Sequence, residues 1–470
     1  MAIRPATDNL PAIEALGVSV PSYDRAALKP RILHLGVGGF HRSHMARYTD
    51  ELAADGSDWG IRGVGLLEGD RRMAAALASQ DHLYTLIERD SERSTTALVG
   101  SIIDYVLAVD DLASFERHLA DPGVAIFSMT ITEGGYSVMD GNPTLEAIAS
   151  ALDARRVAGG APLTILSCDN LPRNGDVARA AITTVCEART DKLAEFVRTS
   201  CAFPNSMVDR ITPQTTDNDR AWLRDEIGVD DAFPVVAETF RQWVIEDDFA
   251  AGRPRYGDVG ALFTDRVHDW ELYKLRMLNA SHSCMAYVMA LAGVVYVDEA
   301  MAMPELRRYL ERFLADEAIP TLTEIPEHPA ADYARTTLHR FENTGVRDQI
   351  ARLCIDGTAK FPSFLIPTVQ RELELGGPID CAALALAAWS RYLARTPPAE
   401  RAPDSSGDRS ASFAARSLDE PEMFLELDEV FPPALRASSR FREAFALACR
   451  ELDTRGAVAA LGRVAGQREA

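Results

Sequence analysis

The chain has 470 residues, of which 47% are hydrophobic and 25% are charged. This composition is typical of folded proteins, and the length exceeds what one ordinary hydrophobic core holds, so we expect two globular domains. With 49 Lys and Arg against 70 Asp and Glu, the net charge is −21. Such an acidic surface repels phosphate backbones and anionic lipids, which argues against nucleic acids and membranes as partners.

The apolar segments and the cysteines indicate neither secretion nor membrane insertion. The first ten residues lack the charged and then apolar pattern of a signal peptide. The longest apolar run, 284–297, has 14 residues, whereas a membrane span needs about 20, so we expect a buried helix there. The seven cysteines include no CxxC pair and the histidines form no HExxH motif. We therefore expect reduced thiols, a cytoplasmic protein and no bound metal.

The first half of the chain alternates apolar runs with helical patterns, which favours an α/β fold with a parallel sheet. The runs expected to form strands are 32–35, 61–67, 124–131 and 163–167, followed by shorter ones at 235–237, 243–245 and 259–263. The windows expected to form helices are 45–52, 71–78, 145–156 and 176–188.

From about residue 265 onward the pattern changes to long helical windows. These windows are 270–297, 305–315, 333–342, 346–353, 381–394 and 440–452. We therefore expect an α/β domain over 1–264 and a mainly α-helical domain over 265–470. The stretch 396–412 is rich in Pro, Ser and charge, and we interpret it as a surface loop or a partly disordered insert.

Three glycines lie between the first expected strand and the first expected helix: Gly36, Gly38 and Gly39. Glycines at this place let the backbone approach a pyrophosphate at a helix N-terminus, where free N–H groups favour anions. His41 stands where the usual GxGxxG pattern has its third glycine. We predict that this turn, with the neighbouring Phe40, binds a dinucleotide.

Acidic residues follow the second expected strand, where a dinucleotide-binding domain contacts the adenosine ribose. Glu68 and Asp70 can accept hydrogen bonds from the ribose hydroxyls, which favours NAD. Arg71 and Arg72 are close enough in sequence to stabilise a 2′-phosphate instead, or they form a solvated helix start. Because the two carboxylates would repel that phosphate, we expect NAD rather than NADP.

The stretch TITEGGY at 130–136 follows a strongly apolar run. In a parallel sheet its polar groups and glycines would lie at the same edge as Gly36, where a cofactor binds. We expect Thr132, Glu133 and Gly134 to contact the cofactor, with an ordinary turn as the alternative.

A helical stretch in the second half carries four polar side chains on one side. At about 100° per residue, Glu271, Lys274, Asn279 and His282 fall within about 140° of each other, and an apolar stripe lies opposite. The alternative is a structural polar stripe on a mostly buried helix.

An enzyme that removes hydride from an alcohol needs a base for the hydroxyl proton and donors for the oxygen. The sequence has neither the zinc ligands nor a distinctive Tyr-Lys pair that serve some dehydrogenases. A lysine can be the base if burial or a nearby cation lowers its pKa. Lys274, Asn279 and Asn170 would supply such a set, if the loop after the strand at 163–167 faces the helix at 270–297.

Six stretches, in this order, resemble the zinc-independent long-chain polyol dehydrogenases of the mannitol 2-dehydrogenase type. They are GVGGFHRSH, TITEGGY, SCDNLPRNG, NSMVDRITP, KLRMLNASH and CIDGTAKFPSF. The resemblance covers about residues 30 to 460, and it implies a Rossmann-type N-terminal domain and a mainly helical C-terminal domain. The segment between Tyr136 and Ser167 looks shorter than is usual in mannitol 2-dehydrogenases, and the acidic pair at the ribose site is spread as Glu-Gly-Asp.

The resemblance also implies roles for individual residues. Lys274 would be the general base, Asn170 and Asn279 would form the oxyanion hole, and His282 would contact substrate hydroxyls. The residues matching the family's remaining site positions are Glu271, for proton release, and Asp209, Arg352 and Lys360, for substrate binding.

These roles describe a metal-independent NAD-dependent enzyme that moves hydride reversibly between C2 of a sugar alcohol such as mannitol and the cofactor, giving a ketose such as fructose. The alternatives are a hexuronate reductase, such as fructuronate reductase, a dehydrogenase of arabinitol or sorbitol, or a non-catalytic NAD-binding regulator. We expect a small-molecule polyol or ketose as the partner, and a monomer or small homo-oligomer.

Overall fold

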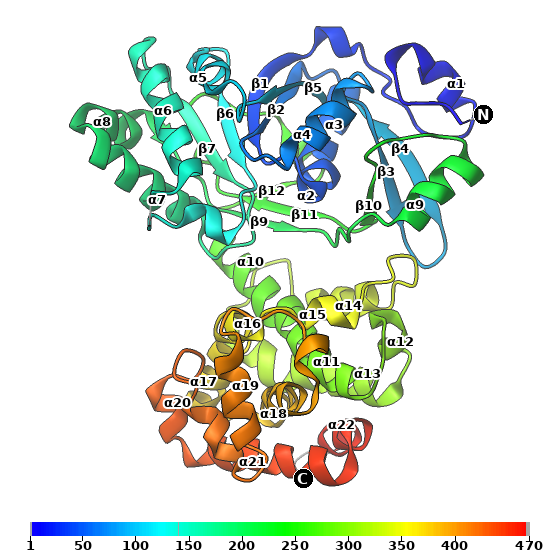
Figure 1. Cartoon of the computed structure of the whole chain (residues 1–470), viewed down its shortest axis with the longest axis vertical. Coiled ribbons are helices and arrows are strands. Elements are labelled where there is room, and N and C mark those ends of the chain that lie inside the picture. The colour runs from blue at the N-terminus through cyan, green and yellow to red at the C-terminus, as the bar shows by residue number, and fades with distance from the viewer. Residues whose placement is uncertain (1, 140, 467–470) are drawn as a thin grey trace. The chain divides into compact units, whose positions relative to one another are not determined.

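The computed structural model of the chain describes residues 2–139 and 141–466. The chain divides into two compact units, Met1–His268 and Asp269–Ala470. The first unit combines sheets with helices, and the second is mainly helical (Figure 1). Within the described residues, no helix has the length and apolar character that crossing a membrane requires.

The first unit is built on a six-stranded sheet in which every neighbouring pair of strands is parallel. The spatial order is β5-β2-β1-β6-β7-β8. The strands are β1 (Lys29–Leu35), β2 (Trp59–Gly65), β5 (Ile102–Leu107), β6 (Ile126–Met129), β7 (Leu163–Ser167) and β8 (Cys201–Ala202). This is the doubly wound order of dinucleotide-binding folds, which confirms the predicted fold class.

Alternating residues of the sheet enter two different cores. On β1, Leu33 and Leu35 belong to one core, and Ile32 belongs to the core on the opposite face. The first core is covered by α5 (Leu112–Ala120), α6 (Pro143–Val157), α7 (Asn174–Arg189) and α8 (Asp191–Ser200). The helices on the second side are α2 (Gly39–Ser43), α3 (Met45–Ala54) and α4 (Asp70–Ala78). Both faces are therefore buried, as parallel sheets require.

Two three-stranded sheets complete the first unit. Their spatial orders are β10-β3-β4 and β12-β11-β9. The strands are β3 (Tyr84–Arg89), β4 (Ser94–Val99), β9 (Ser206–Asp209), β10 (Val235–Glu238), β11 (Gln242–Ile245) and β12 (Leu262–Phe263). The short helical segments of this unit are η1 (Thr7–Asn9), α1 (Leu10–Glu14), η2 (Arg25–Ala27), η3 (Glu133–Tyr136), α9 (Asp217–Trp222), η4 (Leu223–Ile227) and η5 (Tyr256–Val259).

The second unit packs its helices around α18 (Asp380–Arg395), whose residues from Cys381 to Leu393 are all buried. Its neighbours include α11 (Ala280–Leu291), α19 (Asp408–Arg416) and α21 (Ser439–Arg455). The segments from the start to the middle of this unit are α10 (Val267–Tyr273), η6 (Lys274–Asn279), α12 (Val297–Met301), α13 (Pro304–Arg312), η7 (Phe313–Ala318), η8 (Ile319–Thr321) and α14 (Ala330–Phe341). The later ones are α15 (Ile350–Leu353), α16 (Gly357–Phe364), α17 (Ile366–Leu375), η9 (Pro398–Glu400), η10 (Pro421–Glu426), α20 (Pro433–Ala437) and α22 (Ala457–Gly466).

The prediction of one regular helix over 270–297 was wrong in two places. Residues Lys274–Asn279 form a π-helical segment, η6, between α10 and α11. The helix then ends at Leu291, because Gly293 adopts φ +75° just beyond its last turn, a conformation that glycine takes at little cost. The apolar run 284–297 is thus only partly helical.

Three shorter predictions also need correction. Of the helix predicted over 346–353, only α15 is helical in the structure, since Arg347 adopts φ +51°. Of the strand predicted over 259–263, only β12 is extended in the structure, because η5 precedes it and Gly260 has φ +95°. The stretch 396–412 contains η9 and the start of α19, and the Ser405 N–H and hydroxyl donate to the Asp356 carboxylate at the start of α16. Two hydrogen bonds between residues 49 apart in sequence thus hold in place a polar stretch for which composition alone predicts a loop.

One buried arginine closes the loops at the end of the sheet that lies opposite the glycine turn. The Arg155 guanidinium, on α6, donates hydrogen bonds to five backbone carbonyls. The acceptors, at 2.7 to 3.0 Å, belong to Leu119, Asp121, Val124, Ala161 and Pro162. These carbonyls precede β6 and β7, so one side chain fixes where both strands begin.

Replacing Arg155 with Met should destabilise the chain by about 3 kcal/mol, because buried carbonyls lose a charged donor that methionine cannot replace. Urea unfolding followed by circular dichroism measures the change. The matched control is Arg156→Met, because the neighbouring Arg156 makes a partly exposed ion pair with Asp153. Its loss should change stability by less than about 1 kcal/mol. Equal effects of the two substitutions would contradict the role given to Arg155.

Candidate functional site

The glycine turn lies where the order of the central sheet reverses. β1 and β6 are neighbours there, and the chain leaves them in opposite directions. Gly36 has φ +90°, and a Cβ atom on it would lie 2.2 Å from the carbonyl oxygen of Thr130, which follows β6. The Gly36 N–H donates to the carbonyl of Val64 on β2 at 3.1 Å. Only glycine therefore fits at this position.

Two buried histidines, His34 and His41, support the glycine turn: His34 lies within hydrogen-bonding distance of the turn, and His41 stacks on His34. The Thr130 hydroxyl donates to the Gly36 carbonyl at 2.6 Å, and His34 Nε2 lies 3.2 Å from both of these oxygens. His34 Nδ1 lies 2.8 Å from the Ser128 hydroxyl, and the His41 ring stacks on His34 with 3.4 Å between centroids. Burial lowers the pKa of His34 to about 3, so the ring is neutral and serves as a hydrogen-bonding prop.

The predicted loop TITEGGY is anchored by Asp169, a residue that the sequence did not single out. Its buried carboxylate accepts hydrogen bonds from the N–H groups of Ile131 at 3.0 Å and Thr132 at 2.8 Å, and from the Tyr136 hydroxyl at 2.6 Å. Burial raises the pKa of Asp169, although these three donors oppose the shift. The anchor holds Thr132 at φ +61°, which places Thr132, Glu133 and Gly134 on the exposed side of the loop.

The Asn170 loop is fixed in a similar way by Asn174. The buried Asn174 amide donates to the carbonyls of Ser167 at 3.1 Å, Asp169 at 3.1 Å and Ser206 at 2.8 Å. Asn170 itself is exposed at the carboxyl end of β7. The structure therefore brings the glycine turn, the TITEGGY loop and Asn170 to the same edge of the sheet, as predicted for a parallel sheet.

The acidic residues expected at the ribose lie just after β2. The Glu68 carboxylate pairs with Arg71, whose guanidinium also pairs with Asp110 at 2.5 Å. Asp70 begins α4 and accepts a hydrogen bond from the Leu67 N–H at 2.9 Å. The Arg72 guanidinium lies over the Phe233 ring at 5.1 Å. Both arginines considered for a 2′-phosphate, Arg71 and Arg72, therefore make contacts within the protein.

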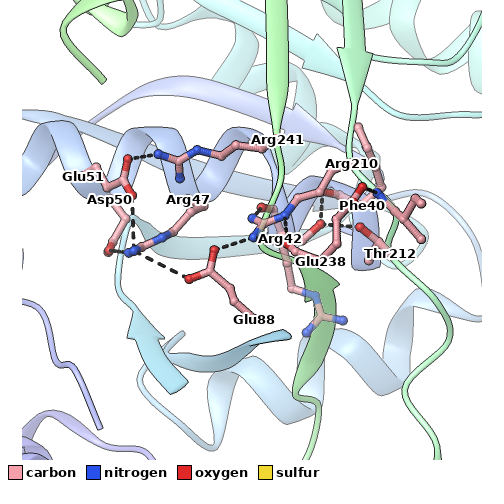
Figure 2. Close-up of polar contacts among 12 residues, drawn as sticks. Phe40, Arg42, Arg47, Asp50, Glu51, Glu88, Arg210, Thr212, Glu238 and Arg241 are labelled. Atoms are coloured by element: carbon pink, nitrogen blue, oxygen red, sulfur yellow. Dashed lines mark hydrogen bonds and ion pairs between the residues drawn. The ribbon is translucent and has the colours of Figure 1, made fainter. Parts of the chain in front are cut away.

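Asp209 is the buried last residue of β9. Figure 2 shows the contacts of its neighbour Arg210. The Arg210 side chain is fully buried and donates to the Glu238 carbonyl from Nε at 3.0 Å and from Nη2 at 2.7 Å. It also bonds to the carbonyl of Ser43, at the end of α2, and to the Glu88 carboxylate. One guanidinium thus connects the strand that carries Asp209 with the helix that follows the glycine turn.

The network continues from Glu88 toward α3 as alternating charges (Figure 2). Arg47 lies 4.0 Å from Glu88 and 3.2 Å from Glu51, and Arg241 pairs with Glu51 as well. The four side chains are only 17 to 25% exposed, and charges so shielded from water are stable only when each has a partner. Sequence reasoning missed this network because its members are distant along the chain.

In the second unit, the π-helical segment η6 begins at Lys274 and ends at Asn279. Residues five apart point about 140° from each other in an α-helix, but the i to i+5 bonding of a π-helix brings them nearly to one side. Lys274 and Asn279 are five apart, so the irregularity turns them closer to the same side of the helix than a regular α-helix would. Glu271 and Lys274 are buried, with 4% and 8% of their surface exposed.

Four buried polar atoms on the stretch 274–291 have no hydrogen-bond partner among the described residues. Besides Arg276 Nε and Ser281 Oγ, these are Asn279 Oδ1 and His282 Nε2. The His282 ring packs against Phe341 with 4.4 Å between centroids. Burial lowers the pKa of His282 to about 3, so the imidazole is neutral. A buried polar atom without a partner is costly, and a ligand hydroxyl would satisfy both Asn279 Oδ1 and His282 Nε2.

The predicted substrate residues Arg352 and Lys360 lie near this histidine. The charges of Asp348, Arg352, Arg340 and Lys360 all act on His282. Arg352 donates from Nε to Asp348 Oδ1 at 2.6 Å and from Nη2 to Oδ2. Lys360 Nζ donates to the Leu353 carbonyl at 3.1 Å. Burial and the charge of Arg352 lower the pKa of Lys360.

The predicted residues fall into two sets. Asn170, Asp209 and the cofactor residues belong to the first unit, and the residues from Glu271 to Lys360 belong to the second. In the described part of the chain, no group of three His, Cys, Asp or Glu side chains is close enough together to hold a metal ion.

Two family models match the chain one after the other. Residues 30–257 match the mannitol dehydrogenase Rossmann domain, and residues 266–453 match the mannitol dehydrogenase C-terminal domain. The chain belongs to the mannitol dehydrogenase family. The resemblance predicted from the sequence motifs is thereby confirmed.

Relatives in the mannitol dehydrogenase family match nearly the whole chain. The chain is similar to mannitol 2-dehydrogenase of Phaeosphaeria nodorum, with 37% identity over 494 residues that cover 98% of this chain and 87% of the relative. Mannitol 2-dehydrogenase of Aspergillus terreus is 40% identical over 417 residues, covering 82% of this chain and 83% of the relative.

Solved structures agree with this family membership. Mannitol 2-dehydrogenase of Pseudomonas fluorescens, in a ternary complex with NAD and D-mannitol, matches with a TM-score of 0.89 and 36% identity, covering 99% of this chain and all of that one. A substrate-free D-sorbitol dehydrogenase matches with a TM-score of 0.87 and 35% identity, covering 98% and 100%.

The first unit fits the dinucleotide that this mannitol dehydrogenase fold implies. At Gly38 a Cβ atom would have no neighbour nearer than 3.9 Å, and no side chain caps the N-terminus of α2 after it. Backbone N–H groups at such a helix start bind phosphate oxygens. Asp70 stands after β2, where an acidic residue accepts the ribose hydroxyls of NAD.

Replacing Asp169 with Asn should loosen the TITEGGY loop, because the amide group brings a donor toward N–H groups that already donate. The expected cost is about 1 to 3 kcal/mol of local stability. Hydrogen exchange should be faster at the amides of Ile131 and Thr132. The control is Asp90→Asn, because Asp90 also accepts from two backbone N–H groups, those of Glu92 and Arg93, but with solvent access. Unchanged exchange at Ile131 and Thr132 would remove the anchor role.

Proposed function

We propose that this chain is an NAD-dependent dehydrogenase that reversibly oxidises a mannitol-like polyol at C2 to the corresponding ketose. Membership of the mannitol dehydrogenase family and the match to a mannitol 2-dehydrogenase in complex with NAD and D-mannitol support the reaction class. The observation that carries the proposal is the place of Lys274 and Asn279 at the two ends of the π-helical segment, among buried polar atoms that need a partner.

In the proposed reaction, Lys274 accepts the proton of the C2 hydroxyl. The amides of Asn170 and Asn279 donate hydrogen bonds to the same oxygen as it gains negative charge, which lowers the barrier to hydride loss. NAD, when bound, supplies the carbon that accepts the hydride. Glu271, buried one helical turn before Lys274, is proposed to carry the proton away from the site.

The remaining polar groups suit an acyclic substrate with many hydroxyls. His282 is neutral, so it can both donate to and accept from a hydroxyl. We propose that His282, Asp209, Arg352 and Lys360 bind the hydroxyls beyond C2. A hexuronate is not favoured, since the guanidinium of Arg352, one of the cations suited to a carboxylate, is already paired with Asp348.

The cysteines indicate the compartment in which the enzyme works. All seven cysteines are free and buried, which supports work in a reducing compartment such as the cytoplasm. We propose that the chain acts as a monomer or small homo-oligomer on a freely diffusing polyol.

Purified protein should reduce NAD fastest with D-mannitol in a panel that also contains D-sorbitol, D-arabinitol and D-mannonate. The readout is NADH absorbance, repeated with NADP and with EDTA. We expect weaker activity with NADP and unchanged activity with EDTA. Faster turnover of mannonate would instead favour a hexuronate enzyme, and nucleotide binding without turnover would favour a non-catalytic protein.

Replacing either Asn170 or Asn279 with Ala should lower kcat by a factor of about a hundred or more, because removing one oxyanion donor costs about 3 to 4 kcal/mol in the transition state. Lys274→Ala should lower kcat further, with partial rescue by added primary amines that replace the base. The control is Lys192→Ala on the exposed side of α8, which should leave kcat unchanged. Near-normal kcat in both asparagine variants would refute the assignment.

A further inference from the structure

A buried carboxylate, Asp348, binds the guanidinium of Arg352, whose charge acts on His282. Asp348 has only 7% of its side chain exposed, whereas Arg352 has 49% exposed. The two side chains form a bidentate pair through both carboxylate oxygens. Fork-to-fork pairing of this kind fixes the orientation of an arginine as well as its position.

The backbone prevents Asp348 from moving away from this pair. Its carbonyl accepts a hydrogen bond from the Val297 N–H at 2.9 Å, and the Ile350 N–H donates to the Val295 carbonyl at 3.0 Å. Tyr296 and Gln349 form an antiparallel bridge between the same two segments. Asp348 is therefore a fixed counter-charge.

The pairing decides what Arg352 can still bind. Nε and Nη2 donate to Asp348, while Nη1 donates to no group within the described residues. The N–H groups left over, two on Nη1 and one on Nη2, can each donate to a hydroxyl oxygen. A substrate carboxylate would have to displace Asp348 to use the Nε–Nη2 fork, which would leave a buried carboxylate without a partner. At the Nη1–Nη2 end it would meet a guanidinium whose charge Asp348 already balances.

We propose that Asp348 is a specificity-determining residue that makes the site prefer uncharged polyols over polyols ending in a carboxylate. This inference rests on the proposed function, because it assumes that Arg352 lies at the substrate. Asp348 does not contact the substrate, and it acts by positioning Arg352 and by neutralising its charge.

The test compares D-mannitol with D-mannonate, which carries a carboxylate in place of one terminal CH2OH group. In Asp348→Asn the ratio of kcat/KM for mannonate to that for mannitol should rise roughly tenfold or more, because the freed guanidinium can pair with the substrate carboxylate. The gain should disappear in the double variant Asp348→Asn with Arg352→Met. Asp348→Ser provides a second test should the asparagine variant fold poorly.

The matched control is Glu299→Gln. Glu299 pairs at 2.9 Å with Arg347, the residue just before Asp348, and it is 49% exposed. Its loss changes the net charge equally but frees no cation that acts on His282, so the substrate ratio should stay constant.

The outcomes separate the two proposals. A parallel loss on both substrates in Asp348→Asn, or a changed ratio that persists without Arg352, would overturn the role of Asp348 while wild-type mannitol oxidation upholds the proposed function. If the wild-type chain prefers mannonate, both proposals fail.

Discussion

The contact between Gly36 and the carbonyl of Thr130 is the constraint on which the first unit depends. There is no space for even a Cβ atom at this point, where β1 and β6 end side by side and the order of the sheet reverses. The close approach lets the Thr130 hydroxyl and His34 bind the Gly36 carbonyl, so the turn is rigid before any ligand arrives. A rigid turn loses little entropy when it binds a phosphate, which favours tight binding.

The two units hold their functional residues in different ways. In the first, buried side chains such as Asp169 and Asn174 form hydrogen bonds to the backbone of the site loops. These bonds fix the positions of exposed neighbours such as Asn170. In the second, the helix itself changes geometry, because the π-helical segment turns Lys274 and Asn279 closer to the same side. A π-helical insertion has poorer packing than a regular helix, and such segments occur often at functional sites.

The charged side chains near His282 also depend on their neighbours. The charges of Arg352 and Lys360 act on the neutral His282, while Asp348 balances part of that positive charge. A site for neutral polyols needs directional hydrogen bonds more than net charge, because hydroxyls are recognised by donors and acceptors placed at defined positions. The guanidinium of Arg352 can still donate hydrogen bonds in fixed directions, while Asp348 compensates its positive charge.

The sequence by itself determined the α/β and helical halves, since hydrophobic periodicity depends on local contacts that the residues Ile32 to Leu35 or 381 to 394 make wherever they are placed. It also determined the glycine turn and the motifs that carry Lys274 and Asn279. Only tertiary structure decided the role of Asp169, the Arg210 network and the π-helical segment at Lys274. These features depend on hydrogen bonds between distant residues or on a local change of helical register, and neither leaves a periodic signal in the chain.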